Sequence, residues 1–249
     1  MRGLLNQLGI CIIIPTYNNI NTICRIVDEC MQWTNSVIVV NDGSTDGTGD
    51  LLSTYIDRGV CVIDYERNKG KGHALKKGFA CAKTKGYRYA VTIDADGQHF
   101  VSDLPAFIRA IQENPNSLIV GSRNLRAERM PESNTFANKF SNFWFSVQTL
   151  QCIPDTQTGY RLYPIHLMGS MWWLTSRYEA ELEMLVYAAW HGVKLIPVPI
   201  HVYYPKQSER VTHFRPFMDF FRISILNFCL CVLALLYGGP CMMLRKFKG

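Results

Sequence analysis

Two carboxylates that follow an apolar run are the residues best placed to do chemistry in this chain. The run Tyr89–Ile93 leads directly into Asp94, Ala95, Asp96 and Gly97. Residues i and i+2 of an extended chain project to the same side, so the two carboxylates should repel each other unless a cation lies between them. Mg²⁺ typically takes one or two protein carboxylates together with oxygens of a phosphorylated substrate. The pattern therefore indicates a metal that holds a diphosphate, although Asp and Gly are also ordinary turn residues.

The segments that must position this pair alternate between apolar strands and helices. Strands are expected at Ile10–Ile14, where Pro15 should end the first one, and at Val37–Val40, Val60–Asp64, Tyr89–Ile93 and Ser117–Gly121. Apolar residues at helical spacing lie between them. This alternation predicts an α/β fold built on a mostly parallel sheet.

Polar clusters follow three of these strands. They are Pro15-Thr16-Tyr17, Asn41-Asp42-Gly43-Ser44 and Asp94-Ala95-Asp96. Ligands of open parallel sheets bind beyond the carboxyl ends of the strands. The three clusters should therefore lie along one edge of the sheet, at the carboxyl ends of its strands. We call this edge the rim, and it is the predicted site.

The alternation weakens after Arg123. We expect a helix over Phe136–Leu150 whose aromatic residues pack in the core, a helix over Tyr178–Trp190, and an edge strand over Leu195–Val202, which carries two prolines. The segment Asp155–Arg161 should bring polar groups back toward the rim.

Composition restricts the class of protein. The 249 residues are 48% hydrophobic and 18% charged, with a net charge of +6, which suits phosphorylated ligands or anionic lipid. The positive charges are dispersed, so nucleic acid is not an expected partner. The 9 cysteines form no Cys-x-x-Cys pair, which argues against a structural zinc site. Their odd number and the absence of a secretory signal favour reduced thiols on the cytoplasmic side of a membrane.

The C-terminal segment differs from the rest of the chain. Residues 223–244 contain no charged side chain, and cationic residues flank them on both sides. This length can cross a bilayer as a helix, but Gly238-Gly239-Pro240 should break the helix late. A spanning helix, a helix in the membrane interface and a re-entrant hairpin all stay open. We divide the chain into a catalytic domain, residues 1–210, and a membrane-associated segment, residues 211–249.

Five motifs together resemble family 2 glycosyltransferases, and among these the dolichyl- or polyprenyl-phosphate mannosyl- and glucosyltransferases. In chain order they are IIPTYNN, VVNDGSTDGT, RNKGKGHA, DADGQH and GSR. The resemblance covers Ile10 to about Val202. It implies a GT-A fold, a nucleoside diphosphate (NDP) sugar donor, Mg²⁺ or Mn²⁺ as cofactor, and inversion at the anomeric carbon.

The resemblance also implies roles for individual residues on the donor side. Asp94, Asp96 and Arg123 would be catalytic, and Asp96 with Gln98 would hold the metal. The donor would contact Pro15, Tyr17, Asn19, Val40, Asp42, Asp94, Ala95, Gln98, Arg123 and Arg210. The family usually has Glu where this chain has Asn19 and often Asp where it has Asn41, so the choice between GDP and UDP stays open.

On the acceptor side the resemblance points to Thr158, Gly159 and Arg161, with Glu181 and His213 as further candidates. A lipid phosphate needs no protein base because its oxygen is already anionic, whereas a hydroxyl acceptor needs a carboxylate to take its proton. The Glu-Asp pair of many hydroxyl-directed relatives is absent, which favours polyprenyl phosphate. Glu179, Glu181 or Asp155 could still serve as a base, and a solvent-exposed helix face is the alternative for the glutamates.

Two other classes of function are considered. A non-catalytic subunit could bind an NDP-sugar or a lipid and tether a partner through the apolar segment. A nucleotidyltransferase would share the fold and the metal, but no glycine-rich basic loop follows the first strand to hold a triphosphate.

Overall fold

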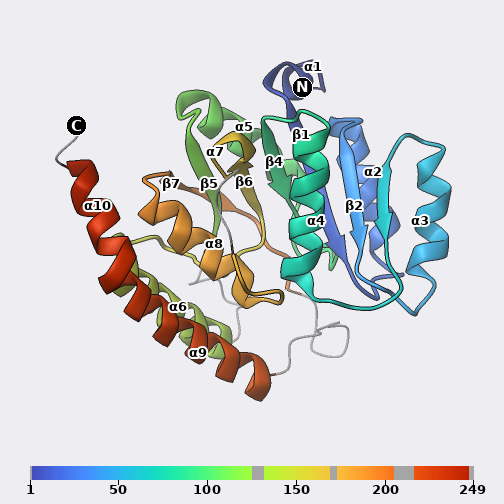
Figure 1. Ribbon diagram of the computed structural model, residues 1–249. Helices are drawn as coiled ribbons and strands as arrows, with labels where there is room; N and C mark the ends of the chain where they lie inside the picture. Colours follow the sequence, from blue (N-terminus) through green and yellow to red (C-terminus); the bar gives the residue numbers. More distant parts are fainter. Residues whose placement is uncertain (1, 125–131, 169–172, 205–215, 247–249) are drawn as a thin grey trace.

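The computed structural model of the chain describes residues 2–124, 132–168, 173–204 and 216–246 (Figure 1). Seven strands form one sheet in the order β3-β2-β1-β4-β6-β5-β7. Their bounds are Ile10–Thr16 (β1), Val37–Asn41 (β2), Cys61–Asp64 (β3), Tyr89–Thr92 (β4), Ser117–Arg123 (β5), Arg161–Pro164 (β6) and Lys194–Ile200 (β7).

The sheet is parallel except for β6. This strand lies between β4 and β5 and runs antiparallel to both, whereas β7 pairs in parallel with β5 at the edge of the sheet. The mostly parallel sheet and the proline-bearing edge strand are confirmed. The sequence indicated that the segment after Asp155 returns to the rim, but it did not indicate that the strand beginning at Arg161 inserts between two parallel strands.

Helices cover both faces of the sheet (Figure 1). One face carries α1 (Arg2–Leu8), α2 (Ile23–Trp33), α3 (Thr48–Ile56) and α5 (Leu104–Glu113), which follows a 3-10 turn at Val101–Asp103. The other carries α4 (Lys71–Thr84), α6 (Glu132–Thr149), α7 (Ile165–Met168), α8 (Glu179–Trp190) and α9 (Pro216–Leu233). Strand β1 serves both cores, because Ile12 packs into the first and Ile13 into the second.

Strand β1 continues through Pro15, contrary to the expectation that the proline would end it. Odd-numbered residues of β1 face β4, since Ile93 N–H donates to Ile13 O, and even-numbered residues face β2, since Asp42 N–H donates to Thr16 O. Pairing with β4 involves only Ile10 to Ile13. The donor that Pro15 lacks would therefore point past the end of β4, so no ladder hydrogen bond is lost there.

The C-terminal helix does not break where the glycines and the proline predicted a break. A π-helical turn at Ala234–Gly238 joins α9 to α10 (Gly239–Lys246), and Pro240 lies in the first turn of α10, where a proline is tolerated. Within the described residues, Phe221–Arg245 is the one helix long and apolar enough to cross a membrane.

Candidate active site

A cavity of about 660 Å³ opens at the carboxyl ends of β1, β2 and β4. Eight of the predicted donor-side residues line it: Pro15, Tyr17, Asn19, Asp42, Asp94, Ala95, Asp96 and Gln98. Asn18, Asn68, Gly70, Lys71, Ala74, Arg177 and Tyr178 also contribute to its wall, as does Thr16. The three polar clusters thus converge on one cavity, as the sheet topology required.

Asp42 holds the loop that leads into α4. Its side chain is only 3% exposed, and its carboxylate accepts hydrogen bonds from the backbone N–H groups of Lys69 and Gly70, at 2.8 and 2.7 Å. Gly43, with φ +69°, brings this turn so close that a Cβ there would lie 2.5 Å from the Arg67 carbonyl carbon. Asp42 therefore positions the cavity wall, and its carboxylate is already engaged before a nucleotide arrives.

The two departures from the family pattern have local structural reasons. Asn41 donates from Nδ2 to Asp64 Oδ1 at 3.0 Å, a contact that a second carboxylate at position 41 would turn into repulsion. Asn19 donates from Nδ2 to Thr16 Oγ1 and to the Tyr17 carbonyl oxygen. A glutamate at position 19 could donate neither hydrogen bond when ionised.

Lys71 joins two carboxylates that come from distant parts of the chain. Its Nζ lies 2.6 Å from Asp94 Oδ1 and 2.9 Å from Glu181 Oε2. Burial alone would lower the pKa of Lys71, but the charges of Asp94 and Glu181 outweigh it and raise the pKa. Burial would raise the pKa of Asp94, yet Lys71 lowers it below its ordinary value. For Glu181 burial prevails, and its pKa is raised.

In the part of the chain that the structure describes, no cationic nitrogen forms an ion pair with Asp96. Its Oδ1 accepts a hydrogen bond from the backbone N–H of Gln98 at 2.9 Å. Burial, followed by the charge of Asp94, raises the pKa of Asp96 to about 6. The described residues contain no cluster of three or more His, Cys, Asp or Glu side chains that could hold a metal by themselves. The Asp96 carboxylate, whose charge is only partly compensated, could bind Mg²⁺ or Mn²⁺ at the cavity wall. The metal would take its other ligands from a diphosphate and water.

His99 lies near Asp94, with Nε2 4.0 Å from Asp94 Oδ2. It is 7% exposed, and burial lowers its pKa to about 4. The imidazole is therefore neutral at physiological pH and adds no positive charge to the site.

Arg123 forms a forked ion pair with Asp155. Its Nε and Nη2 donate to the two carboxylate oxygens at 2.6 and 2.9 Å, and Asn138 Nδ2 donates to the same carboxylate. Arg123 does not line the cavity that holds Asp96. In this conformation Arg123 ties β5 to the loop before β6, and its predicted donor contact stays a prediction.

The remaining predicted acceptor residues have structural neighbours rather than open surface. Arg161 is 0% exposed and donates to the carbonyl oxygens of Thr156 and Glu181, so we assign it a positioning role in place of a direct acceptor contact. Thr158 is 1% exposed and its hydroxyl accepts a hydrogen bond from Tyr160 N–H. Gly159 approaches Asp94 so closely that a Cβ there would lie 2.4 Å from Asp94 Oδ2.

Two further predictions need correction. The side chain of Val40 packs in the core and is 0% exposed, so it cannot line the cavity. The glutamates of α8 do not form a solvated face, because Glu179, Glu181 and Glu183 are 8%, 6% and 2% exposed. Glu183 accepts hydrogen bonds from the backbone N–H groups of Leu174 and Thr175. Arg210 and His213 lie outside the described residues.

Sequence reasoning missed Lys71, Arg177 and Tyr178 as wall residues. Lys71 had a signal, because it stands in a glycine-rich turn that opens a helix, and a helix N-terminus favours anions. Gly72 lets this helix end approach the start of α8, because a Cβ at Gly72 would lie 2.5 Å from Ala180 Cβ. Arg177 had no local signal, because only the fold brings the loop before α8 to the cavity.

Comparisons with known proteins agree with this geometry. The undecaprenyl-phosphate mannosyltransferase of Micrococcus luteus is 30% identical over 200 residues, covering 76% of this chain and 81% of that protein. The dolichyl-phosphate beta-glucosyltransferase of Dictyostelium discoideum is 28% identical over 185 residues, covering 64% of this chain and 55% of that protein.

Solved structures support the fold. The glucosyl-3-phosphoglycerate synthase of Mycobacterium tuberculosis, in complex with Mn²⁺, UDP and phosphoglyceric acid, superposes with a TM-score of 0.64 over 96% of this chain and 81% of that chain, at 17% identity. The predicted GT-A fold is confirmed. The model of Glycosyl transferase family 2 matches residues 11–160. The chain therefore belongs to family 2 of the glycosyltransferases, and it is a glycosyltransferase of the branch that resembles the polyprenyl-phosphate sugar transferases.

Proposed function

We propose that this protein transfers a hexose, with inversion, from an NDP-sugar to polyprenyl phosphate at the cytoplasmic face of a membrane. The observation that carries the proposal is the single cavity in which Asp42, Asp94 and Asp96 meet the first turn of α4 and Arg177. Two relatives that act, by name, on undecaprenyl and dolichyl phosphate support the lipid acceptor.

The wall of the cavity supplies both signs of charge that an NDP-sugar needs. Asp96 with Gln98 would hold Mg²⁺ or Mn²⁺, which when bound neutralises charge on the departing diphosphate. Lys71, the first residue of α4, and Arg177 also line the cavity and add positive charge next to a helix N-terminus. Lys71 also keeps Asp94 ionised and fixed in place, 2.6 Å away.

The state of the carboxylates supports an acceptor that is already anionic. Asp42 is bound to backbone N–H groups, Asp94 is paired with Lys71, and Glu181 does not line the cavity. Asp155 forms an ion pair with Arg123. A hydroxyl acceptor would need a free carboxylate to take its proton, whereas a phosphate oxygen would attack the anomeric carbon as the bond to the nucleoside diphosphate breaks.

One assay tests the proposal. The purified full chain is incubated with a panel of NDP-sugars, Mg²⁺ or Mn²⁺, and either polyprenyl phosphate or polyprenol, and lipid products are identified by mass. We expect product from the phosphate only, and a loss of about 100-fold or more in Asp96→Asn with Asp50→Asn, on α3, as control.

Other outcomes would redirect the proposal. Product from polyprenol would mean a hydroxyl acceptor. Donor binding without any product would favour the non-catalytic subunit. Full transfer by Asp96→Asn would remove Asp96 from the mechanism.

A further inference from the structure

Large apolar side chains are exposed along the C-terminal helix. Those more than 40% exposed on α9, the π turn and α10 are Met218, Phe221, Ile225, Phe228, Val232, Leu235, Leu236, Tyr237, Met243 and Leu244. Phe228 is 71% exposed and Leu235 80%. Soluble proteins rarely leave an apolar surface of this length uncovered, so it is expected to contact a partner or a lipid phase.

Helix α6 adds to this surface. The sequence predicted that its aromatic stripe would pack in the core, but Phe143 is 57% exposed, Val147 47%, and Leu150, just after the helix, 84%. The two helices lie side by side along the lower edge of Figure 1. Gln148 Nε2 on α6 donates to Asn227 Oδ1 on α9 at 3.0 Å, which fixes the helices to each other. We call the exposed apolar side chains of both helices the apolar ridge.

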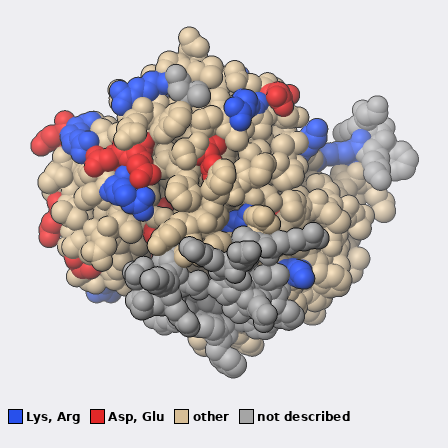
Figure 2. Space-filling view, turned by 180° about the vertical axis from the view of Figure 1, so that it is seen from behind, with Lys and Arg blue, Asp and Glu red and all other residues tan. Residues whose placement is uncertain are grey.

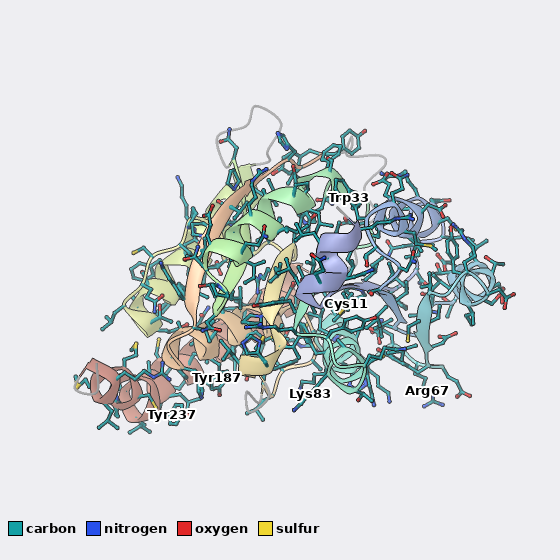
Figure 3. The ribbon with its side chains drawn as sticks, turned by 90° about the horizontal axis from the view of Figure 1, so that it is seen from above. Cys11, Trp33, Arg67, Lys83, Tyr187 and Tyr237 are labelled. Atoms are coloured by element: carbon teal, nitrogen blue, oxygen red, sulfur yellow. The ribbon has the colours of Figure 1, made fainter. Side chains whose placement is uncertain are left out.

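The C-terminal helix lies against the rest of the protein at two places, the middle of α9 and the π turn. Leu226 and Leu230 on α9 are buried in the core that the domain shares with α8. Within the π turn, the Tyr237 ring lies 6.2 Å from the Trp190 ring and its hydroxyl is 3.3 Å from His191 Nε2. Figure 3 places Tyr187 of α8 and Tyr237 at the same side of the molecule. A helix that crossed a bilayer would carry one end about 30 Å away from the domain, whereas in this conformation α10 still contacts α8.

The charges around the ridge favour an anionic lipid surface. Cations outnumber acids in the sequences of α6, α9 and α10, where Lys139, Arg222, Arg245 and Lys246 stand against Glu132 and Asp219. In Figure 2 most acidic side chains lie on the side that carries α2 and α3, with lysines and arginines among them. Cations beside an apolar helix face are attracted to anionic headgroups while the apolar side chains enter the acyl boundary.

We propose that the apolar ridge docks in the interface of an anionic phospholipid bilayer, with the α9–α10 helix parallel to the membrane plane and not across it. This chooses one of the three topologies that the sequence left open. The inference deepens the membrane location in the proposed function and rests on it, but it does not depend on which sugar is transferred.

Vesicle sedimentation without any sugar donor tests the docking. The full chain is mixed with vesicles of phosphatidylcholine alone or with phosphatidylglycerol, and we compare Phe228→Glu and Leu235→Glu with Ile56→Glu, which alters a 55% exposed side chain on α3. We expect binding to the anionic vesicles that both ridge variants weaken about tenfold or more and the control leaves unchanged. Circular dichroism and NDP-sugar binding should be unchanged in all three, which separates docking from folding and from donor recognition.

Alkaline carbonate extraction tests the orientation. An in-plane helix should be released from the vesicles, whereas a spanning helix should be retained. Retention in the membrane, wild-type vesicle binding by both ridge variants, or loss of a dimer in size-exclusion chromatography with no change in vesicle binding would each overturn the proposal. Failure of sugar transfer alone would leave the docking result standing and would count against the proposed function only.

Discussion

Lys71, the first residue of α4, and Asp94, which follows the end of β4, form an ion pair 2.6 Å long at the wall of the cavity. The same ammonium reaches Glu181 on α8, so one cation fixes three elements of the site. Asp94 is thereby compensated, whereas Asp96, which lines the same cavity, keeps a raised pKa of about 6. Asp94 and Asp96 therefore have different electrostatic states, although only one residue separates them.

We predict that Lys71→Met lowers the free energy of unfolding by about 3 kcal/mol, because it leaves Asp94 and Glu181 buried without their cation. Transfer should fall about 100-fold. Chemical denaturation and the lipid-product assay measure the two effects, with Lys77→Met, an exposed lysine of the same helix, as control. The double variant Lys71→Met/Glu181→Gln should regain stability without regaining activity. If Lys71→Met transferred sugar at the wild-type rate, the ion pair would be structural only.

Gly159→Ala should reduce turnover about 10- to 100-fold, because small displacements of reacting groups have effects of this size. A Cβ at this position would lie 2.4 Å from Asp94 Oδ2 and 2.7 Å from Lys71 Nζ, so one of the two groups must move. Steady-state kinetics should show the loss mainly in kcat. Gly3→Ala, where a Cβ meets nothing within 4 Å, is the matched control. Unchanged kcat in Gly159→Ala would show that the Asp94–Lys71 geometry tolerates displacement.

The lowered pKa of Asp155 leads us to predict a specific dependence of stability on pH. Burial would raise the pKa of this carboxyl, but its hydrogen bonds and ion pair with Arg123 lower it below the ordinary value of 3.8. A lowered folded-state pKa stabilises the protein above the unfolded-state pKa, and this contribution is lost as pH falls through the folded-state pKa. Asp155→Asn should therefore cost about 3 kcal/mol at pH 7 and progressively less below pH 3.8. Urea unfolding at a series of pH values measures this difference, and a difference that grew toward acid pH would contradict the assignment.

The strands and the rim could be predicted from the sequence because their signals are local. The apolar runs before Pro15, Asn41 and Asp94 each end in polar residues, and the topology of parallel sheets then brings those residues together. The position of β6 could not be predicted, because nothing local to Arg161 specifies that its neighbours are β4 and β5.

The buried glutamates of α8 show the same limit. Alternating glutamates are typical of a solvated helix, and only distant groups make their burial possible here. Glu181 forms an ion pair with Lys71, which is distant in sequence. Glu183 accepts hydrogen bonds from backbone N–H groups of the loop that precedes α8. Likewise, the sequence showed the glycines and the proline near Gly238 but not the π turn that accommodates them.

Gly238→Ala should loosen the C-terminal helix from the domain. A Cβ at this position would lie 2.4 to 2.7 Å from ring atoms of Trp190, whose indole is 0% exposed and donates from Nε1 to the Gln148 carbonyl oxygen at 2.8 Å. The ring therefore cannot turn aside without losing that hydrogen bond. Replacing glycine by alanine in a helix gains up to about 1 kcal/mol, but overpacking costs about 1 to 3 kcal/mol, so we expect net destabilisation.

Thermal unfolding measures this effect, and Gly239→Ala is the comparison. Its nearest heavy atom, the Ala234 carbonyl oxygen, would be 3.1 Å from the new Cβ, so a smaller change is expected. Because Gly238 is far in sequence from the cavity residues and does not line the cavity, binding of an NDP-sugar should be retained. A melting temperature of Gly238→Ala equal to or above that of the wild type would mean that α10 does not depend on Trp190 for its position, and the in-plane orientation of the helix would lose one of its two attachments.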